Sequence, residues 1–488
     1  MMKTYKPTIG LEIHAELATR TKMFCDSPND PFNSKPNANV CPICMGHPGT
    51  LPVINKKAIL HVLRVGVALG SEIADFSEFD RKNYFYPDIP KGYQISQYKH
   101  PLVSGGELAG VKITRVHLEE DTASSSHDEG DYSLIDFNRA GVPLLELVTE
   151  PVIHSAEQAG NFGRELQLLL RTLGVSEANM EKGEMRIEAN ISVASAEQTA
   201  IKKFGAKVEV KNLNSFKSVE KAVDYEILRQ TALSESGEKI EQETRGWDDA
   251  KGKTVSQRKK ENSHDYRYFP DPDLPKLKIS EISEFSLVNL QKTMPELPWE
   301  KRERYKNLGL KPTDIHIYTT IPTVGKFFEN VAKELDNKKD SILLASNYIT
   351  TDILGLIKSK YGEGKEYEIE NLSFGPKEFS LVISLLENKS FSSRSAKDTL
   401  SLMFGYKKTT EKLDPEKIAR ENGLIQKSAE EFVKKIAEEV IKENQKVAED
   451  YKRGKQASLQ FLIGQGMKKS KGSANPEILK TIIISLLS

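Results

Sequence analysis

Alternating apolar and polar residues recur in the first part of the chain and predict β-strands. In residues 8–17, apolar side chains at every odd position from 9 alternate with Glu12, His14 and Glu16. Side chains along a strand point to opposite faces in turn, so the apolar row faces a core and the polar row faces away from it. The same alternation occurs in four further segments, residues 115–121, 144–150, 185–193 and 208–211. This pattern predicts an antiparallel sheet with one buried face.

Helical periodicity replaces the alternation beyond Pro298. Within the strand-rich part, Ser155 starts one predicted helix, because Ser155-Ala-Glu-Gln is a capping box followed by apolar residues at helical spacing. Asp414-Pro415 is typical of the start of a further helical segment. We therefore predict an α+β protein with three parts: a sheet-based domain at residues 1–293, a helical linker domain at 294–413 and a small all-helical tail domain at 414–488.

Composition excludes several classes of protein. The 488 residues are 38% hydrophobic and 29% charged, which is typical of a globular chain and not of a disordered one. The 70 basic and 70 acidic residues balance, so net charge selects no partner. We expect no secretory signal and no membrane segment, because no apolar run approaches the roughly 20 residues that span a bilayer. With only three cysteines, we expect a protein of the reducing cytoplasm.

The polar faces of the predicted strands carry the candidate chemistry. Each contains at least one glutamate, and histidine, asparagine and a few bases accompany them. A solvated sheet face is the alternative for any single strand, but several glutamates on one surface repel unless cations lie between them. Oxygen ligands suit Mg²⁺, and magnesium held by carboxylates is typical of phosphoryl-transfer sites. The sequence has no glycine-rich phosphate loop, so a nucleotide would be held by carboxylates and metal.

Shared faces extend this candidate site to neighbouring strands. Arg186, Glu188 and Asn190 form one polar row, and we expect them to bind the nucleotide. Lys211 lies two residues after Glu209 and is a further catalytic candidate.

Two other segments have a composition of their own. Residues 81–98 mix five tyrosine or phenylalanine rings with Arg81, Lys82 and Lys91, a combination that stacks bases and meets phosphates in RNA-binding proteins. Ordinary core aromatics beside a solvated loop are the alternative.

Cys41-Pro-Ile-Cys44, with Cys25 upstream, has the spacing of a metal knuckle, but structural zinc needs four ligands. His47 is a possible fourth ligand, and free structural cysteines are the alternative.

Five motifs resemble those of one family, the B subunits of the bacterial aspartyl/glutamyl-tRNA(Asn/Gln) amidotransferases. The resemblance extends through Asn475-Pro476 and so covers essentially the whole chain. The motifs are long and keep the family's order: Gly10-Leu-Glu-Ile-His-Ala-Glu-Leu17, Asp80-Arg-Lys-Asn-Tyr-Phe-Tyr-Pro87, His117-Leu-Glu-Glu-Asp121, Lys211-Asn-Leu-Asn-Ser-Phe216 and His264-Asp-Tyr-Arg-Tyr-Phe-Pro-Asp-Pro-Asp273.

The resemblance implies a fold and a reaction. It implies a cradle-shaped domain similar to the catalytic domain of glutamine synthetase, a helical linker, and a helical tail that recognises the tRNA elbow. The implied reaction is phosphorylation by ATP of an aspartate or glutamate misattached to tRNA, followed by amidation with ammonia. The chain lacks the serine-rich amidase signature, so the ammonia is expected from a separate amidase A subunit, with a small C subunit completing a heterotrimer.

The resemblance also implies site residues. By motif, the catalytic candidates are Glu12, His14, Glu119, Glu120 and Glu209, and four of them are the expected magnesium ligands: Glu12, His14, Glu119 and Glu209. One departure concerns zinc, expected on Cys25, Cys41 and Cys44 if it binds at all. Zinc-containing members carry Cys-x-Cys before the knuckle, whereas Cys25-Asp-Ser27 supplies only the first cysteine.

Two other functions fit parts of the same pattern. A metal-dependent nuclease would also use clustered carboxylates. A non-enzymatic RNA-binding scaffold would use the basic tail, where residues 451–488 carry seven lysines or arginines against one acid. A requirement for misacylated tRNA separates the amidotransferase from the nuclease, and turnover that Glu12→Gln abolishes separates it from the scaffold.

Overall fold

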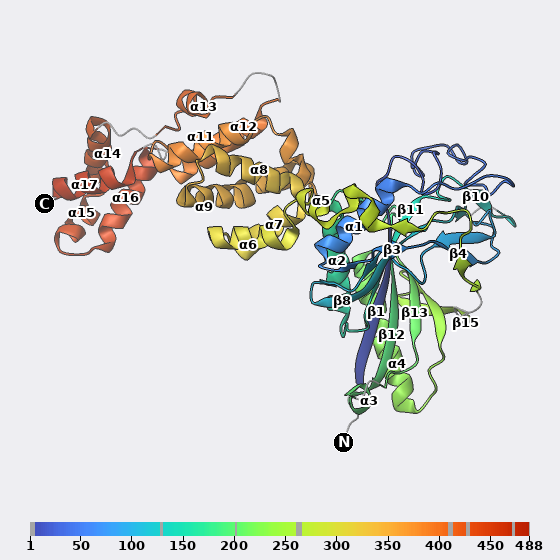
Figure 1. Ribbon diagram of the computed structural model, residues 1–488. Helices are drawn as coiled ribbons and strands as arrows, with labels where there is room; N and C mark the ends of the chain where they lie inside the picture. Colours follow the sequence, from blue (N-terminus) through green and yellow to red (C-terminus); the bar gives the residue numbers. More distant parts are fainter. Residues whose placement is uncertain are drawn as a thin grey trace. The chain divides into compact units, whose positions relative to one another are not determined.

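A computed structural model describes residues 5–126, 130–200, 203–259, 266–407, 413–425, 430–470 and 474–487 (Figure 1). His264 and Asp265 of the last sequence motif lie outside these ranges. The chain forms two compact units, Met1–Pro298 and Trp299–Ser488.

A ten-stranded sheet organises the first unit. Its strand order is β15-β14-β13-β12-β1-β11-β8-β6-β2, and β7 pairs with β8. Neighbouring strands are antiparallel except for β13 and β14, which are parallel because the helix α4 crosses between them. The strands are β1 (Tyr5–Glu16), β2 (Glu72–Ile73), β6 (Val103–Ser104), β7 (Glu107–Leu108), β8 (Val111–Glu120), β11 (Pro143–Thr149), β12 (Met185–Ser195), β13 (Val208–Leu213), β14 (Glu243–Asp248) and β15 (Lys253–Lys259).

Three smaller sheets lie beside the large one in the same unit. Their strands, in paired order, are β16 (Phe269–Pro270) with β4 (Asp80–Asn83) and β5 (Tyr93–Ser96), β10 (Leu134–Asp136) with β9 (Ser124–Ser126), and β17 (Leu277–Lys278) with β3 (Phe76–Ser77).

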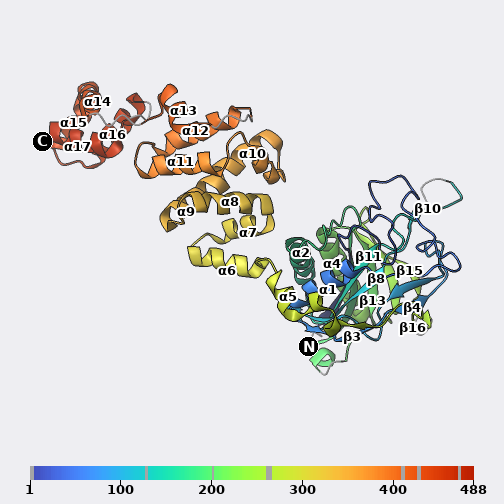
Figure 2. The same ribbon diagram turned by 45° about the horizontal axis from the view of Figure 1, so that its top comes forward.

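Helices cover the apolar face of the large sheet, and α1, α2 and α4 lie together on one side of it in Figure 2. The apolar row of β1 is fully buried against them, which leaves the polar row on the other face. The capping box predicted at Ser155 is present, since Ser155 Oγ accepts a hydrogen bond from the Gln158 amide. The helices are α1 (Lys56–Ala68), α2 (Ala156–Thr172), α3 (Ala196–Ala200), α4 (Phe216–Ser236) and α5 (Leu287–Lys292), with short 3-10 turns η2 (Ile279–Glu281) and η3 (Ser283–Phe285).

The second unit is helical throughout its described residues, and the α+β class is confirmed. Its helices are α6 (Pro298–Leu308), α7 (Pro312–Thr320), α8 (Pro322–Glu334), α9 (Lys339–Asn347), η4 (Tyr348–Ile353), α10 (Leu354–Tyr361), η5 (Glu366–Asn371), α11 (Pro376–Glu387), α12 (Ser393–Gly405), α13 (Pro415–Glu421), α14 (Glu430–Glu443), α15 (Gln445–Lys452), α16 (Ala457–Lys469) and α17 (Pro476–Leu487).

Two separate hydrophobic cores occupy this helical unit. One runs from Tyr305 to Ala419, and the other from Val433 to Leu487. Ile418 and Ala419 of α13 belong to the first core, so the packing changes after α13.

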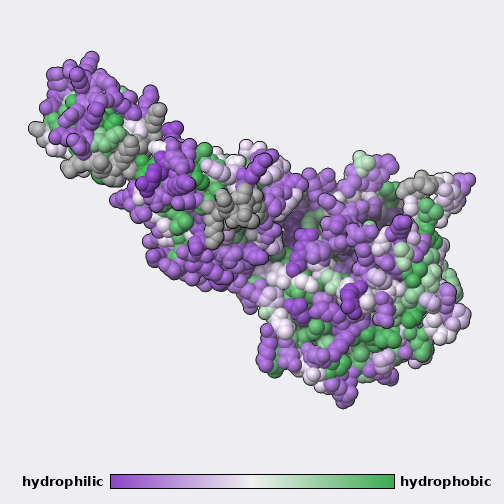
Figure 3. All heavy atoms as spheres, turned by 90° about the horizontal axis from the view of Figure 1, so that it is seen from above, coloured by the Kyte–Doolittle hydropathy of each residue, from purple (hydrophilic) through white to green (hydrophobic). Residues whose placement is uncertain are grey.

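Most of the surface seen in Figure 3 is hydrophilic. None of the helices among the described residues has the length and apolar character needed to cross a bilayer.

Candidate active site

Strand register places the predicted polar rows on one continuous face of the large sheet. On β1, Glu12 lies opposite Glu188 of β12, and His14 lies opposite Glu146 of β11. Glu146 in turn lies opposite His117 of β8. Directly paired residues of neighbouring strands have Cβ atoms about 4.5–5.5 Å apart on the same face. The polar positions of β12, β1, β11 and β8 therefore converge.

One group of ligand atoms centres on Glu146. Its Oε2 lies 3.5 Å from His14 Nε2 and 3.4 Å from His117 Nε2. Glu119 joins through an Oε1 atom 3.5 Å from the same His14 nitrogen, and Ser96 Oγ donates to the other oxygen of Glu119 at 3.1 Å. Glu119 and Glu146 are nearly fully buried. Two carboxylates and two imidazoles thus meet in a site of low solvent access.

A second group lies on the neighbouring strands. Glu12, Glu188 and Glu209 each offer a carboxylate oxygen within 4.8 Å of the others. Lys211 Nζ contacts Glu188 Oε2 at 2.7 Å, and Thr244 Oγ1 donates to Glu209 Oε2 at 2.8 Å. Glu12 also belongs to a set with His14 and Glu146, so the two groups are adjacent and share this residue.

Burial and mutual charge shift the proton affinities of this face. Burial, followed by the charge of Glu146, raises the pKa of Glu12. Burial opposes protonation of His14, but the hydrogen bond and charge of Glu146 outweigh it and raise the pKa of His14 to about 9. Burial also disfavours the charged form of Glu146, yet His117 and His14 hold its pKa well below the usual range. The face therefore disfavours ionisation of Glu12 and keeps a proton on His14.

These donors fit magnesium. Mg²⁺ takes oxygen ligands, mainly carboxylates, and within each group the ligand atoms lie within 4.8 Å of one another. Four predicted ligands meet at this double site: Glu12, His14, Glu119 and Glu209.

Glu120 does not join them. It follows Glu119 directly on β8, and adjacent strand residues point to opposite faces. Its carboxylate lies 2.5 Å from Lys91 Nζ and accepts the Ile95 amide at 2.9 Å. The structure therefore places Glu120 in a buried ion pair away from the carboxylate face.

The three residues predicted to bind nucleotide have different surroundings. Arg186 makes paired hydrogen bonds of 3.0 Å to Asp121, whose pKa is held low by Arg186 and Arg139 against the effect of burial. Glu188 is paired with Lys211, as described above. The side-chain oxygen of Asn190 is buried and has no hydrogen-bond partner among the described residues.

Glu146, His117 and Lys82 were not among the predicted site residues. The first two lie on the alternating polar rows, so the pattern contains them, but only the register shows that both face His14. Lys82 belongs to the aromatic segment; its Nζ lies 5.0 Å from the centre of the Tyr266 ring. Burial opposes its charge, but Glu119 leads the neighbours that raise the pKa of Lys82.

The aromatic residues divide into two kinds. Tyr84, Tyr266 and Tyr268 pack edge to face in a chain, and Tyr98 stacks on Tyr268 with 4.3 Å between ring centres. These rings line the side of the site that holds Lys82. By contrast, Phe85 is 87% exposed.

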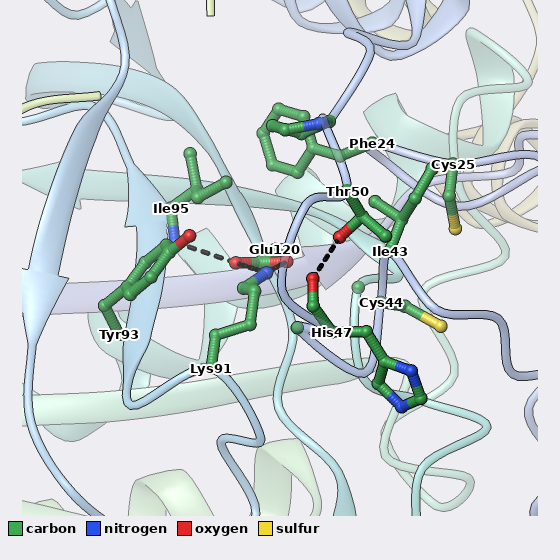
Figure 4. A pocket seen from close by; sticks show the side chains of 13 residues that line it. Phe24, Cys25, Ile43, Cys44, His47, Thr50, Lys91, Tyr93, Ile95 and Glu120 are labelled. Atoms are coloured by element: carbon green, nitrogen blue, oxygen red, sulfur yellow. Dashed lines mark hydrogen bonds and ion pairs between the residues drawn. The ribbon is translucent and has the colours of Figure 1, made fainter. Parts of the chain in front are cut away.

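The three cysteines form a separate group, of which Cys25 and Cys44 are labelled in Figure 4. Their sulfur atoms lie within 4.8 Å of one another, and no histidine or carboxylate of the described chain completes the set. Lys22 Nζ lies 3.9 Å from Cys44 Sγ. A hydrogen bond from Cys25 lowers the pKa of Cys44 to about 5 and raises that of Cys25. Three thiols beside a buried ammonium do not fit tetrahedral structural zinc, which needs four ligands.

Comparisons with known proteins agree with this architecture. Residues 7–283 match the GatB/GatE catalytic domain, and residues 326–487 match the GatB domain. Three curated relatives are named as B subunits of aspartyl/glutamyl-tRNA(Asn/Gln) amidotransferases. The one from Caldicellulosiruptor saccharolyticus is 43% identical over 98% of both chains, the one from Thermodesulfovibrio yellowstonii 42% over 99%, and the one from Thermus thermophilus 41% over 99%. The chain belongs to this family, the B subunits of the aspartyl/glutamyl-tRNA(Asn/Gln) amidotransferases.

Proposed function

We propose that this chain activates and amidates the side-chain carboxylate of aspartate or glutamate misattached to tRNA(Asn) or tRNA(Gln), using ATP and ammonia. The observation that carries the proposal is the single sheet face on which the two ligand groups meet. The names of relatives that match the full chain support it. Activation is needed because a carboxylate is a poor electrophile, whereas an acyl phosphate has a good leaving group.

The residues suited to hold magnesium form two adjacent sets. Glu12, Glu188 and Glu209 form one, and His117, Glu119 and Glu146 form the other, with His14 lying 3.5 Å from both Glu119 and Glu146. Magnesium bound there would neutralise charge on the ATP phosphates. His14 holds a proton at neutral pH and must release it before its nitrogen can act as a ligand.

Other side chains of the same face position the substrates. Lys82 presents an ammonium beside Glu119, where a phosphoryl oxygen would meet a fixed positive charge. Lys211 holds Glu188 in place. Arg186 binds Asp121 and so positions the start of the loop after β8, while Asn190 offers its buried oxygen as an acceptor for the nucleotide. The exposed Phe85 ring provides a surface on which an unpaired base can stack.

The partners in this proposal follow from the reaction. An amidase A subunit supplies ammonia, a small C subunit completes the heterotrimer, and the reaction takes place in the cytoplasm, where tRNA is charged. We assign residues 1–293 to catalysis, 294–413 to a linker and 414–488 to tRNA binding. The basic composition of residues 451–488 supports contact with a phosphate backbone.

The proposal is tested by measuring ATP cleavage in the assembled heterotrimer with misacylated tRNA. Glu12→Gln and Glu209→Gln are expected to abolish tRNA-dependent cleavage and to leave glutamine hydrolysis by the A subunit unchanged. Glu107→Gln is the matched control, because it removes an exposed strand glutamate far from the ligand groups in the sheet register. Full activity of Glu12→Gln would refute the metal assignment and favour the scaffold, whereas cleavage of the tRNA itself would favour the nuclease.

A further inference from the structure

The three cysteines occupy a pocket that the proposed reaction does not use. Cys25 follows β1, and Cys41 and Cys44 belong to a hydrogen-bonded turn at residues 41–47. Cys25 and Cys44 are 8% and 5% exposed, and Cys41 is partly exposed. All three sulfur atoms lie within 4.8 Å of one another, so a small rotation of the side chains brings a pair to bonding distance.

The surroundings of Cys44 favour its thiolate. Lys22 is completely buried, and its Nζ lies 3.9 Å from Cys44 Sγ while donating to the Phe137 carbonyl at 3.1 Å. The Cys41 amide also points at the same sulfur, at 3.1 Å. An ammonium and an amide proton beside a sulfur stabilise its negative charge, and the thiolate is the reactive form of cysteine.

A cavity gives a small oxidant access to this sulfur. It has a volume of about 70 Å³ and is lined by both Cys25 and Cys44, with His47 and Lys91. In Figure 4 the sulfur atoms of Cys25 and Cys44 lie on the same side of the cavity. A molecule the size of hydrogen peroxide fits this space, since a water molecule needs roughly 10–15 Å³ of such volume.

We propose that Cys44 and Cys25 form a reversible disulfide when a hydroperoxide enters the cavity. The Cys44 thiolate attacks the peroxide, the O–O bond breaks, and Cys44 sulfenic acid and an alkoxide or hydroxide form. The Cys25 thiol then attacks the sulfenic sulfur, the S–O bond breaks, and the disulfide forms as the leaving hydroxide takes up the thiol proton. Each disulfide reduces one peroxide by two electrons, and a dithiol reverses the step by exchange.

The disulfide would change the loop that it closes. Residues 26–43 would be tied at both ends, and the thiolate charge beside Lys22 would disappear. This loop already contacts the segment at residues 136–138, because the backbone amide of Asn37 donates to the Asp136 carboxylate and that of Asn39 donates to the Asn138 side chain. The modification would therefore stiffen a surface segment next to the buried pair of Lys91 and Glu120.

The test counts thiols in the full chain, purified with reductant that is then removed. After graded hydrogen peroxide and denaturation, maleimide-polyethylene glycol gel shifts are expected to show loss of two of the three thiols and their return with dithiothreitol. Peptide mapping is expected to identify the bond between Cys25 and Cys44. Metal analysis of the untreated protein is expected to find zinc far below one atom per chain.

Variants test the role of each group. Cys44→Ser and Cys25→Ser are expected to prevent the bond, and Cys41→Ser is expected to leave it. Lys22→Met is expected to slow thiol loss at least about 10-fold, because it removes the cation beside the thiolate. Lys35→Met, at an exposed lysine of the same loop, is the matched control and is expected to have no effect. Stoichiometric zinc that protects the thiols, or retention of all three thiols at peroxide levels that oxidise free cysteine, would overturn the proposal.

Discussion

The pair formed by Lys91 and Glu120 provides a stringent test of the site described above. Sequence motifs place Glu120 among the catalytic candidates, whereas the structure places it in a buried ion pair. The side chains of Lys91 and Glu120 are 11% and 6% exposed, and Lys91 Nζ lies 2.5 Å from the Glu120 carboxylate. We therefore expect Glu120 to stabilise the fold and not to bind magnesium.

The expected loss in the free energy of unfolding depends on which charges remain buried after each substitution. Lys91→Met keeps the length of the side chain but leaves a buried carboxylate with the Ile95 amide and without its cation. Removing one partner of a buried ion pair costs about 3–5 kcal/mol, because the remaining charge has lost its compensation. The double variant Lys91→Met/Glu120→Gln removes both charges, and we expect it to cost less than about 2 kcal/mol.

Fluorescence can follow the unfolding of this unit alone. The chain has two tryptophans. Trp247 is buried in β14 and donates to Asp249, while Trp299 belongs to the second unit. In a Trp299→Phe background, Trp247 reports on the first unit. The midpoint of thermal unfolding should fall by roughly 2–4 °C for each kcal/mol lost from the free energy of unfolding, which makes the expected effect of Lys91→Met easy to measure.

Two results would refute this reasoning. A cost below about 1 kcal/mol for Lys91→Met would mean that Glu120 is not held by Lys91 in solution. A Glu120→Gln variant that loses thermal stabilisation by magnesium would mean that Glu120 is a ligand after all. The structure predicts that this stabilisation is kept, because Glu120 faces away from the carboxylate groups.

Three further predictions concern other parts of the chain. Glu146→Gln should reduce tRNA-dependent ATP cleavage by at least about 100-fold and abolish the magnesium-induced shift in melting temperature, because Glu146 contacts both histidines of the site. Truncation after Ile425 should weaken tRNA affinity at matched salt while ATP cleavage at saturating misacylated tRNA persists, and it spares α13, which packs into the first helical core. Burial lowers the pKa of His61 to about 4, whereas the same side chain in the unfolded chain takes up a proton below about pH 6.5. Protonation therefore favours the unfolded chain, and up to about 3 kcal/mol of the free energy of unfolding should be lost as pH falls from 6.5 to 4. Thermal melts of His61→Gln should not show this loss.

Strict alternation made the long strands predictable. In β1 every second side chain from Ile9 to Ala15 is apolar and fully buried, and the register to β12 and β11 keeps the polar row on one face. Two-residue strands such as β2 and β3 are too short to show a period, so no pattern predicts them. The parallel pairing of β13 and β14 depends on the path of α4 across the sheet, which the composition of the two strands does not reveal.

The site was partly predictable for the same reason. Side chains alternate between the two faces along β8, so the adjacent residues Glu119 and Glu120 cannot share a face. The sequence alone is enough for this argument. The contact of Glu146 with His14 could not be predicted from the sequence, because it depends on the register between two strands that lie roughly 130 residues apart in the chain. Lys22 lies outside any periodic pattern, so only the structure shows that its ammonium approaches the cysteines.

The distribution of charge on the sheet face shows which carboxylate a bound cation would affect. Glu188 is neutralised by Lys211, and Glu146 by His14 and by Arg115 at 3.3 Å. Glu12, which lies between these two neutralised groups, resists ionisation, because burial and the charge of Glu146 both act against it. A divalent cation bound there would offset both effects by placing a positive charge beside the Glu12 carboxylate. Glu12, the residue shared by both ligand groups, is therefore a carboxylate whose ionisation a bound cation would favour.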